Sequence, residues 1–362
     1  PFKQYYGTID ATPLFIVLAG KYYKRTGDIK TIEELWPNIE MALEWIEKYG
    51  DIDGDLFVEY ERKEVSGLFN QGWKDSYDSV SYENGKIADL PIALCEVQGY
   101  VYDAWKKAST LARVLGHKEK ADELKKRAGE LKKKFSKYFW SERKSTFYLA
   151  LAENKIPCNV VSSNAGHCLF SGIAYPSQAK KIAQILLSEE MFTGWGIRTL
   201  SSKEVRYNPM SYHNGSVWPH DNALIAFGFS KYGLKEEVAK VTSALFDASL
   251  FSEGQRLPEL FCGFKRKPGE APTNYPVACS PQAWSVATVF MTIQALLGMD
   301  INESKGLIRF YKPYLPEFLN RVSIKNLKFR KLKLNLDFNR AGNSVSIIMH
   351  NKNVPVKLEV IY

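Results

Sequence analysis

Apolar residues recur at helical spacing through most of the first 300 positions of the chain. Leu14, Val17, Leu18 and Tyr22 fall on one face of a helix predicted over residues 9–25. A stripe of this kind is typical of a helix that packs one face against a protein core. The pattern therefore favours packed amphipathic helices over this part of the chain.

A second helix is predicted to begin at Thr31, because Glu34 follows three residues later as in a capping box, and to end at Gly50. Six further stretches with helical periodicity complete the predicted set: 89–115, 118–138, 177–187, 216–232, 235–250 and 281–297. The chain is therefore predicted to be mainly α-helical.

Short glycine turns and long loops alternate between these helices. Gly116 and Gly233 each separate two neighbouring predicted helices, which indicates helical hairpins. The segments 67–84, 192–214 and 251–280 are longer than the connections of a simple helix bundle and contain many aromatic residues and glycines. Long loops in a compact protein are usually functional, so we expect the site to lie in them.

The periodicity changes near residue 307, where polar and apolar residues begin to alternate. Alternation at 321–329, 331–338, 345–349 and 356–360 predicts antiparallel strands. Turns are predicted at two places, 341–343 and 351–353. We expect a small β-rich segment at the C-terminal end.

The net charge of +9 belongs almost entirely to this C-terminal segment. Residues 301–362 contain 12 Lys and Arg against 4 Asp and Glu, whereas the other 300 residues contain 37 basic and 36 acidic groups. The Lys and Arg occupy the outward positions of the alternating strands, which is typical of a solubilising face that protects sheet edges. Because no aromatic RNA-binding motif or phosphate loop accompanies them, we do not expect nucleic-acid binding.

The composition is that of a globular protein, with 45% hydrophobic and 25% charged residues in 362. Five scattered cysteines at irregular spacing predict neither a disulfide framework nor a zinc site, and they fit a cytoplasmic location. No apolar run approaches the length of a membrane span. Since the chain begins at Pro1 without a Met, we expect a truncated or processed N-terminus.

Asp75 is the first candidate for chemistry, because it lies beside Trp73 and Tyr77 in a glycine-containing loop. An aromatic environment can desolvate a carboxyl group and raise its pKa, as a general acid requires, and aromatic faces stack on sugars. The alternative is an ordinary capped turn, and the loop by itself does not decide between them.

Glu259 is the second candidate, because it stands alone in an apolar stretch. A buried carboxylate is stable only if it is paired or hydrogen-bonded, unless it serves a function. A salt bridge with Arg256 or Arg266 is the simpler alternative.

The run 211–222 concentrates His, Asn, Asp, Trp and Tyr ahead of a predicted helix, which matches a sugar ligand. Two carboxylates in such surroundings indicate glycoside hydrolysis.

At these positions the sequence resembles the amylo-α-1,6-glucosidase family, the glucosidase part of glycogen debranching enzymes. The likeness runs in collinear order through five blocks: 5–15, 72–76, 212–222, 257–259 and 278–284. The blocks 72–76 and 212–222 are the specific ones, whereas Leu-Pro-Glu by itself is a weak signal. The resemblance covers nearly the whole chain.

The resemblance implies an (α/α)6 six-hairpin toroid and an inverting reaction without a metal or organic cofactor. It implies that Asp75 is the general acid and Glu259 the general base, about 6.5–9.5 Å apart. The subsite for the cleaved sugar would be lined by Asp10, Trp73, His213, Asn214, Trp218, Gln282 and Trp284.

The sequence departs from this family in its number of helices. A six-hairpin toroid needs twelve helices, whereas the eight helical stretches predicted here include several short ones. The block at 5–15 normally lies after the first helices of the family's toroid. We therefore expect an N-terminally incomplete toroid, and self-association or a partner chain that covers its open side.

The sequence thus predicts a catalytic toroid over residues 1–300 and a β-rich segment over 301–362. The main hypothesis is an inverting hydrolase that cleaves α-1,6-linked glucosyl residues of glycogen-type oligosaccharides. One alternative is a related hydrolase for another α-linked sugar, such as a mannosylglycerate-type compound or a rhamnoside. The other is an inactive fragment that binds carbohydrate.

Overall fold

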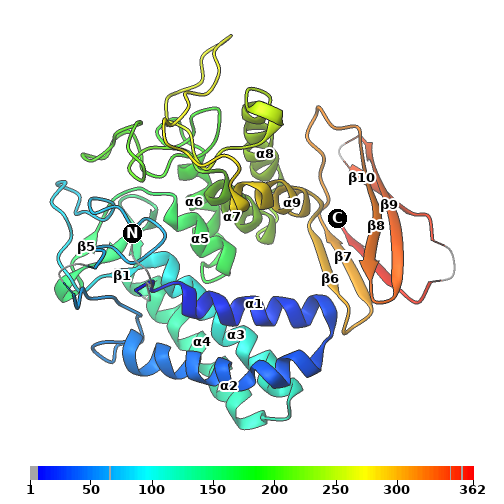
Figure 1. The fold of residues 1–362 in the computed structure, drawn as a ribbon, viewed down its shortest axis with the longest axis horizontal. Coiled ribbons are helices and arrows are strands. Elements are labelled where there is room, and N and C mark those ends of the chain that lie inside the picture. Colours follow the sequence, from blue (N-terminus) through cyan, green and yellow to red (C-terminus); the bar gives the residue numbers. More distant parts are fainter. Residues whose placement is uncertain (1–6, 65–66, 343, 352–353) are drawn as a thin grey trace.

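The computed structural model describes residues 7–64, 67–342, 344–351 and 354–362. These residues form a mainly helical protein with small sheets (Figure 1). Their nine α-helices are α1 (Ala11–Thr26), α2 (Ile29–Trp45), α3 (Cys95–Val114), α4 (Lys118–Tyr138), α5 (Asn164–Ser171), α6 (Pro176–Leu186), α7 (Pro219–Lys231), α8 (Lys235–Ser249) and α9 (Ala283–Leu297).

The odd-numbered helices form one row, in which α1, α3, α5, α7 and α9 contact each other in that order. Each even-numbered helix packs against the odd-numbered helix before it, as the predicted hairpins require. The turns inside the hairpins are short, and Gly27 and Gly233 have the positive φ angles, 68° and 75°, that such turns favour. The long loops all lie between hairpins and lead into the N-terminal ends of the odd-numbered helices.

Glycine permits the close approach of helices in this row. A Cβ atom on Gly228 of α7 would lie 2.8 Å from the backbone nitrogen of Phe170 in α5. A Cβ atom on Gly166 of α5 would lie 2.4 Å from the Ile225 side chain of α7. Both positions therefore require a residue without a side chain, and the close contact brings the loops before α5 and α7 together.

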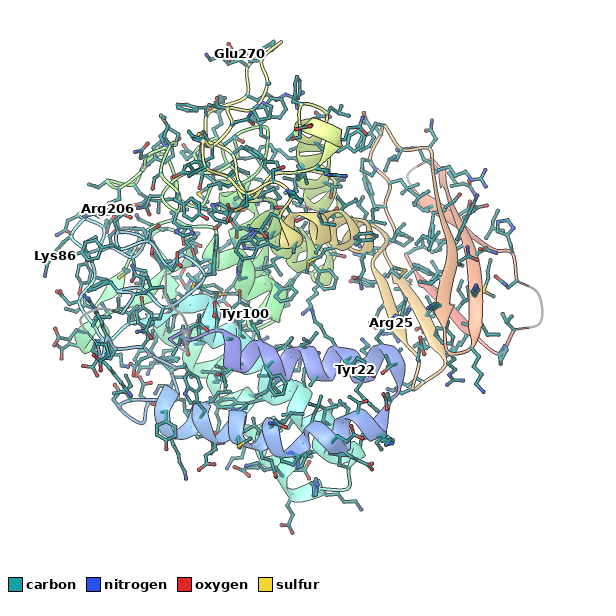
Figure 2. All side chains as sticks on the ribbon, viewed as in Figure 1. Tyr22, Arg25, Lys86, Tyr100, Arg206 and Glu270 are labelled. Carbon is teal, nitrogen blue, oxygen red and sulfur yellow. The ribbon has the colours of Figure 1, made fainter. Side chains whose placement is uncertain are left out.

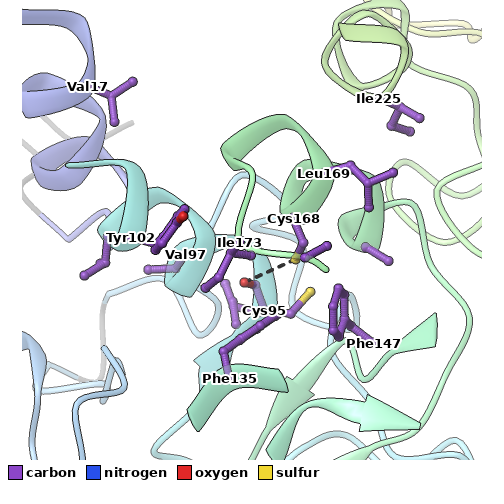
Figure 3. Packing of buried hydrophobic residues seen from close by; sticks show 14 of the residues in the cluster. Val17, Cys95, Val97, Tyr102, Phe135, Phe147, Cys168, Leu169, Ile173 and Ile225 are labelled. Atoms are coloured by element: carbon purple, nitrogen blue, oxygen red, sulfur yellow. Dashed lines mark hydrogen bonds between the residues drawn. The ribbon is translucent and has the colours of Figure 1, made fainter. Parts of the chain in front are cut away.

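The core between the helices is a single hydrophobic cluster that extends from Ile9 to Leu296. Figure 3 shows part of it, where Cys95 and Cys168 pack among Val97, Phe135 and other apolar side chains. The Cys168 thiol donates to the carbonyl of Cys95 at 3.5 Å. All five cysteines are free, and four of them are buried.

The start of α2 differs from the prediction. Asp28, not Thr31, is the N-cap, because the Asp28 side chain accepts a hydrogen bond from the Thr31 backbone N–H at 3.1 Å. The capping-box prediction was therefore wrong, and Thr31 lies inside the first turn. The second helix ends as predicted at Gly50, through a π-helical turn over Ile46–Gly50.

Several short elements have no counterpart among the predictions. Helix α5 has no polar face, because all eight of its residues are buried, so it lacks the amphipathic signal. Five strands of two residues each are too short for a periodic pattern: β1 (Ala93–Leu94), β2 (Trp140–Ser141), β3 (Thr146–Phe147), β4 (Ala150–Leu151) and β5 (Pro157–Cys158).

The C-terminal segment forms two three-stranded sheets over β6 (Met299–Asn302), β7 (Leu307–Tyr311), β8 (Arg321–Phe329), β9 (Leu332–Ala341), β10 (Ser344–Met349) and β11 (Lys357–Ile361). Strands β8, β9 and β10 are antiparallel, as predicted. The prediction for β11 was wrong, because β11 pairs with β7 in parallel. Position 343 of one predicted turn and positions 352–353 of the other lie outside the described residues.

Strand β6 joins the two parts of the molecule, because it contacts both α1 and α9. Lys24 of α1 pairs with Asp300 at 2.5 Å, and Arg25 pairs with Glu303 and donates to the carbonyl of Lys328 (Figure 2). A second hydrophobic cluster, from Leu297 to Val345, fills the space between the sheets. The boundary expected at residue 300 falls inside β6, and the division into two domains stays a prediction.

Within the described residues, every helix is too short or too polar to cross a lipid bilayer.

Candidate active site

The candidate site lies where the N-terminal ends of the odd-numbered helices meet. Glu96 at the start of α3 accepts a hydrogen bond from the Asn164 amide at the start of α5, at 2.9 Å. His167 of α5 lies 2.7 Å from Asp221 at the start of α7. The partial positive charge of helix N-termini favours carboxylates at these positions.

Asp75 projects from a loop whose own residues are joined by hydrogen bonds. The Asn70 amide donates to the carbonyls of Ser76 and Tyr77, at 2.7 and 3.1 Å. The Asp75 side chain is 52% exposed, and its Oδ1 lies 4.0 Å from Nδ1 of His213. Partial burial raises the pKa of the Asp75 carboxyl group above its ordinary value.

Glu259 is 6% exposed and is fixed by hydrogen bonds from two directions. The Tyr212 hydroxyl donates to Oε1 at 2.7 Å, and the Cys279 backbone N–H donates to Oε2 at 3.0 Å. Gln282 makes a longer contact with Oε1 at 3.5 Å. Within the described residues Glu259 forms no salt bridge, so the alternative of a pair with Arg256 or Arg266 was wrong. Arg266 pairs with Asp247 instead, at 2.6 Å.

Tyr212 and His213 connect the surroundings of the two carboxylates. Their rings lie 4.6 Å apart, with Glu259 at the Tyr212 hydroxyl and Asp75 beside His213. Burial, Glu259 and Asp75 raise the pKa of the Tyr212 phenol. The structure therefore brings together two carboxylates that are far apart in the sequence.

Aromatic and imidazole rings form the wall of the site. Trp73 lies edge-on to Trp218 at 5.8 Å and to His213 at 5.7 Å. His220 stacks on Trp284 at 4.1 Å, and Trp284 lies 5.8 Å from Trp218. Burial lowers the pKa of both histidines to about 3, so they are neutral in the physiological range.

A buried polar network lies behind Trp73. His167 stacks on Trp73 at 5.7 Å and bridges the Tyr100 hydroxyl, at 2.6 Å, and Asp221. Burial opposes ionisation of Asp221, but His167 and the Lys74 charge hold the pKa of that carboxyl group below its ordinary value. The site thus keeps a charged carboxylate in its interior.

Two further carboxyl groups near this network respond differently to burial. Burial raises the pKa of Glu96, and burial together with Glu96 raises the pKa of Asp10, the N-cap of α1, from 3.8 to about 6. Lys74 is the buried cation among them, and burial lowers its pKa to about 8. The interior of the site therefore combines an acid, Asp10, with a pKa of about 6 and a base, Lys74, with a pKa of about 8.

Four residues of this network were not predicted from the sequence. Glu96 and Tyr100 lie within a predicted helix whose sequence carries no signal of a site, and His167 lies in α5, which the sequence does not predict. Lys74 lies in the loop that carries Asp75, where no pattern distinguishes it. Asp221 belongs to the run 211–222, and the density of polar groups in that run is the signal that could have found it.

Within the described residues, several buried polar atoms of the site have no hydrogen-bond partner: Trp73 Nε1, Asn164 Oδ1, His220 Nδ1 and Asp221 Oδ2. Buried polar atoms in native proteins are almost always hydrogen-bonded, so each of these needs an explanation. One donor and several acceptors close to an aromatic wall match a ligand that carries hydroxyl groups.

Asn214, another predicted site residue, makes hydrogen bonds within the protein. The Asn214 side-chain amide donates to the carbonyl of Asp78 at 3.1 Å, and the Asn214 backbone carbonyl accepts from the Asn208 N–H at 2.8 Å. Asn214 therefore ties the loop before α7 to the loop that carries Asp75. The other predicted residues lie at the site as described above.

Three carboxylates outside the site could supply metal ligands, but a lysine ammonium lies among them. Asp51, Asp53 and Glu59 offer carboxylate oxygens within 4.8 Å of one another. The Lys155 ammonium lies 2.9 Å from Asp53 and also contacts Glu59. Lys155 therefore offsets part of the negative charge of this group and joins the loop that follows α2 to the turn before β5.

Two hollows of the described residues lie away from Asp75 and Glu259. One of about 570 Å³ lies between the start of α8 and the C-terminal sheets. Another of about 610 Å³ borders residues 7–9, 45–64 and 67–71. Neither is lined by Asp75 or Glu259, so the site is identified by its chemistry and not by the size of a cavity.

Solved structures with a similar fold include a sialidase, a mannosylglycerate hydrolase and a rhamnosidase. A sialidase matches 94% of this chain with a TM-score of 0.72 at 14% identity, and the chain spans only 31% of that structure. The family 63 mannosylglycerate hydrolase from Thermus thermophilus matches with a TM-score of 0.59 at 14% identity, over 81% of each chain. The family 78 rhamnosidase of Bacillus sp. GL1 matches 96% of this chain and 34% of its own, with a TM-score of 0.62 at 14% identity.

Residues 6–256 match the family described as the mannosylglycerate hydrolase MGH1-like glycoside hydrolase domain. The chain belongs to this family and is a glycoside hydrolase domain. A comparison with curated protein sequences gives no match. The debranching-enzyme family that the motifs resemble is not shown by these matches.

Proposed function

We propose that this protein hydrolyses an α-linked glycoside with inversion, with Asp75 as general acid and Glu259 as general base. The observation that carries the proposal is the contrast between the two carboxylates on either side of Tyr212 and His213. Asp75 is half exposed, has a raised pKa and faces a neutral imidazole, so it can carry a proton. Glu259 is buried and oriented by two hydrogen bonds.

In the proposed reaction the proton of Asp75 passes to the glycosidic oxygen as the bond from that oxygen to the anomeric carbon breaks. A water molecule attacks the anomeric carbon from the opposite face and gives its proton to Glu259. The products are the free sugar, with inverted configuration, and the alcohol. The two carboxyl groups exchange their protonation states and are reset through solvent.

We infer that the cleaved sugar lies against Trp73, Trp218 and Trp284, with its hydroxyl groups toward the unpaired polar atoms behind Trp73. The apolar face of a sugar ring suits an aromatic wall, and its hydroxyls supply the missing partners. Asp10, His213 and Gln282 are proposed to complete this subsite. The helical row is proposed to be part of a six-hairpin toroid, as in the structural relatives.

A mannosylglycerate-type compound is the first substrate to test, because the family match extends over residues 6–256. The α-1,6-linked glucosyl stub of a glycogen-type oligosaccharide is the second, because the blocks 72–76 and 212–222 resemble amylo-α-1,6-glucosidases. The proposed self-association is a separate question that sedimentation would answer.

The test is a panel of α-mannosylglycerate, α-glucosylglycerate, branched gluco-oligosaccharides and α-rhamnosides, assayed for release of free sugar. Glu259→Gln should reduce hydrolysis of the accepted substrate by more than about 10³-fold, while the exposed Glu253→Gln, six residues upstream, should leave it unchanged. The first-formed anomer, followed by proton NMR, should be the inverted one. Retention of configuration, or near wild-type activity of Glu259→Gln, would contradict the proposal, and binding of sugar without turnover would favour a carbohydrate-binding protein.

A further inference from the structure

Lys74 is a buried lysine directly before the proposed general acid. Its side chain is 5% exposed and points inward, whereas that of Asp75 points to the surface. The Lys74 ammonium donates to the Ser163 hydroxyl at 3.1 Å and to the Thr199 carbonyl at 2.8 Å. These partners belong to the segments that lead into α5 and α7.

The backbone of Lys74 is fixed as well. Its carbonyl accepts a hydrogen bond from the Ser79 hydroxyl at 2.5 Å, which closes the loop on itself. The ammonium also lies 5.0 Å from the centre of the Trp73 ring. Trp73 and Asp75 are the neighbours of Lys74 in the chain, and both belong to the proposed substrate site.

We propose that Lys74 is a positioning residue that sets the place of Asp75 by tying its loop to the segments before α5 and α7. The inference rests on the proposed function of Asp75. The Lys74 side chain is buried whereas that of Asp75 is half exposed, so the two side chains leave the loop in different directions. Anchoring the Lys74 side chain therefore fixes the backbone from which Asp75 projects. A shift of about 1 Å in a reacting group can cost about 10²-fold in rate.

The charge of Lys74 acts on other groups. Asp221 and Glu96 stabilise the ammonium, and the Lys74 charge adds to burial in lowering the pKa of His213. Lys74 is not among the groups that shift the pKa of Asp75, which partial burial raises. Its influence on the acid is therefore geometric, and loss of Lys74 should impair the step in which the leaving group receives a proton.

A pair of substrates isolates that step. A glycoside needs a proton on its leaving oxygen, whereas a glycosyl fluoride loses fluoride without one and needs only the water that Glu259 activates. The probes are mannosylglycerate with α-mannosyl fluoride, and isomaltose with α-glucosyl fluoride. The measured quantity is the ratio of kcat/KM for the glycoside to kcat/KM for the fluoride.

We expect this ratio to fall by about 10²-fold or more in Asp75→Asn and by at least about 10-fold in Lys74→Met. The matched control is Lys235→Met, since Lys235 is also buried and donates to the Ser230 hydroxyl and the Ala295 carbonyl, far from the site. Lys235→Met should lower stability and leave the ratio unchanged. An equal loss on glycoside and fluoride in Lys74→Met would overturn the positioning role.

Ser163→Ala is the milder variant if Lys74→Met does not fold, because it removes one hydrogen bond and keeps the charge. It should lower the ratio in the same direction by a few-fold, and an unchanged ratio would contradict the proposal. Failure of the proposed function is distinguishable, because Asp75→Asn would then leave the ratio unchanged or Glu259→Gln would retain activity on both substrates.

Discussion

Asp75 and Glu259 differ in the surroundings that their loops give them. Asp75 is half exposed and lies beside the neutral His213, so among the described residues no cation pairs with it and holds it in the ionised form. Glu259 receives hydrogen bonds from Tyr212 and from a backbone N–H, both of which fix its direction. The same type of side chain can therefore serve as an acid in one loop and as a base in the other.

The raised pKa of Asp75 predicts the pH dependence of hydrolysis. A general acid must be protonated, so kcat/KM for a glycoside should fall as the pH rises through the pKa of Asp75. His213, with a pKa of about 3, contributes no decline in the same range. The measurement is a pH profile on a glycoside and on the matching glycosyl fluoride, and a common alkaline decline on both would contradict the assignment.

At the scale of elements, the contact between α5 and α7 shows how glycine sets the distance between helices. Neighbouring backbones approach closely at Gly228, where any side chain would meet Phe170 and Leu169. The two helices carry His167 and Asp221, so their separation determines whether these residues can pair. Helix spacing and site geometry are therefore linked in this region.

Replacement of Gly228 by Ala should destabilise the protein by about 1–3 kcal/mol, because the new Cβ would lie 2.8 Å from a backbone atom that cannot move alone. Gly129→Ala on α4 is the matched control. A Cβ atom at Gly129 meets nothing within 4 Å, so this variant should gain about 0.5–1 kcal/mol. Urea unfolding of both variants measures the difference, and equal midpoints would refute the packing argument.

At the scale of the whole molecule, the positive charge is separate from the site. Arg321, Lys325 and Lys328 point outward from β8, as the alternating sequence predicted. The helical part that carries the site is close to neutral. An uncharged sugar therefore meets no strong electrostatic barrier or attraction at the site.

Substitution of Lys325 and Lys328 by Gln together should leave hydrolysis unchanged and should alter the free energy of unfolding by no more than about 0.5 kcal/mol for each residue, because both side chains are exposed. Steady-state assays and urea unfolding would show this. A fall in activity would mean that the charged face takes part in substrate binding.

The sequence predicted much of this architecture because each signal was local. Six long helices and the strands β8 and β10 lie close to their predicted bounds, since amphipathic and alternating patterns report which face is buried. Helix α5 was missed because a helix buried on all sides has no pattern. The parallel pairing of β11 was missed because the alternation of side chains is the same in either direction.

For the site, the sequence by itself determined which loops carry aromatic residues and carboxylates, because these residues are concentrated in short runs such as 72–76 and 211–222. Only the tertiary structure decided that Lys74, Glu96, Tyr100 and His167 belong with them. These four lie in three separate segments, since Glu96 and Tyr100 share α3, and their pairings depend on how closely the helices pack. The physical reason is that burial and hydrogen-bond partners are properties of the folded chain, whereas residue type and spacing are present in the sequence.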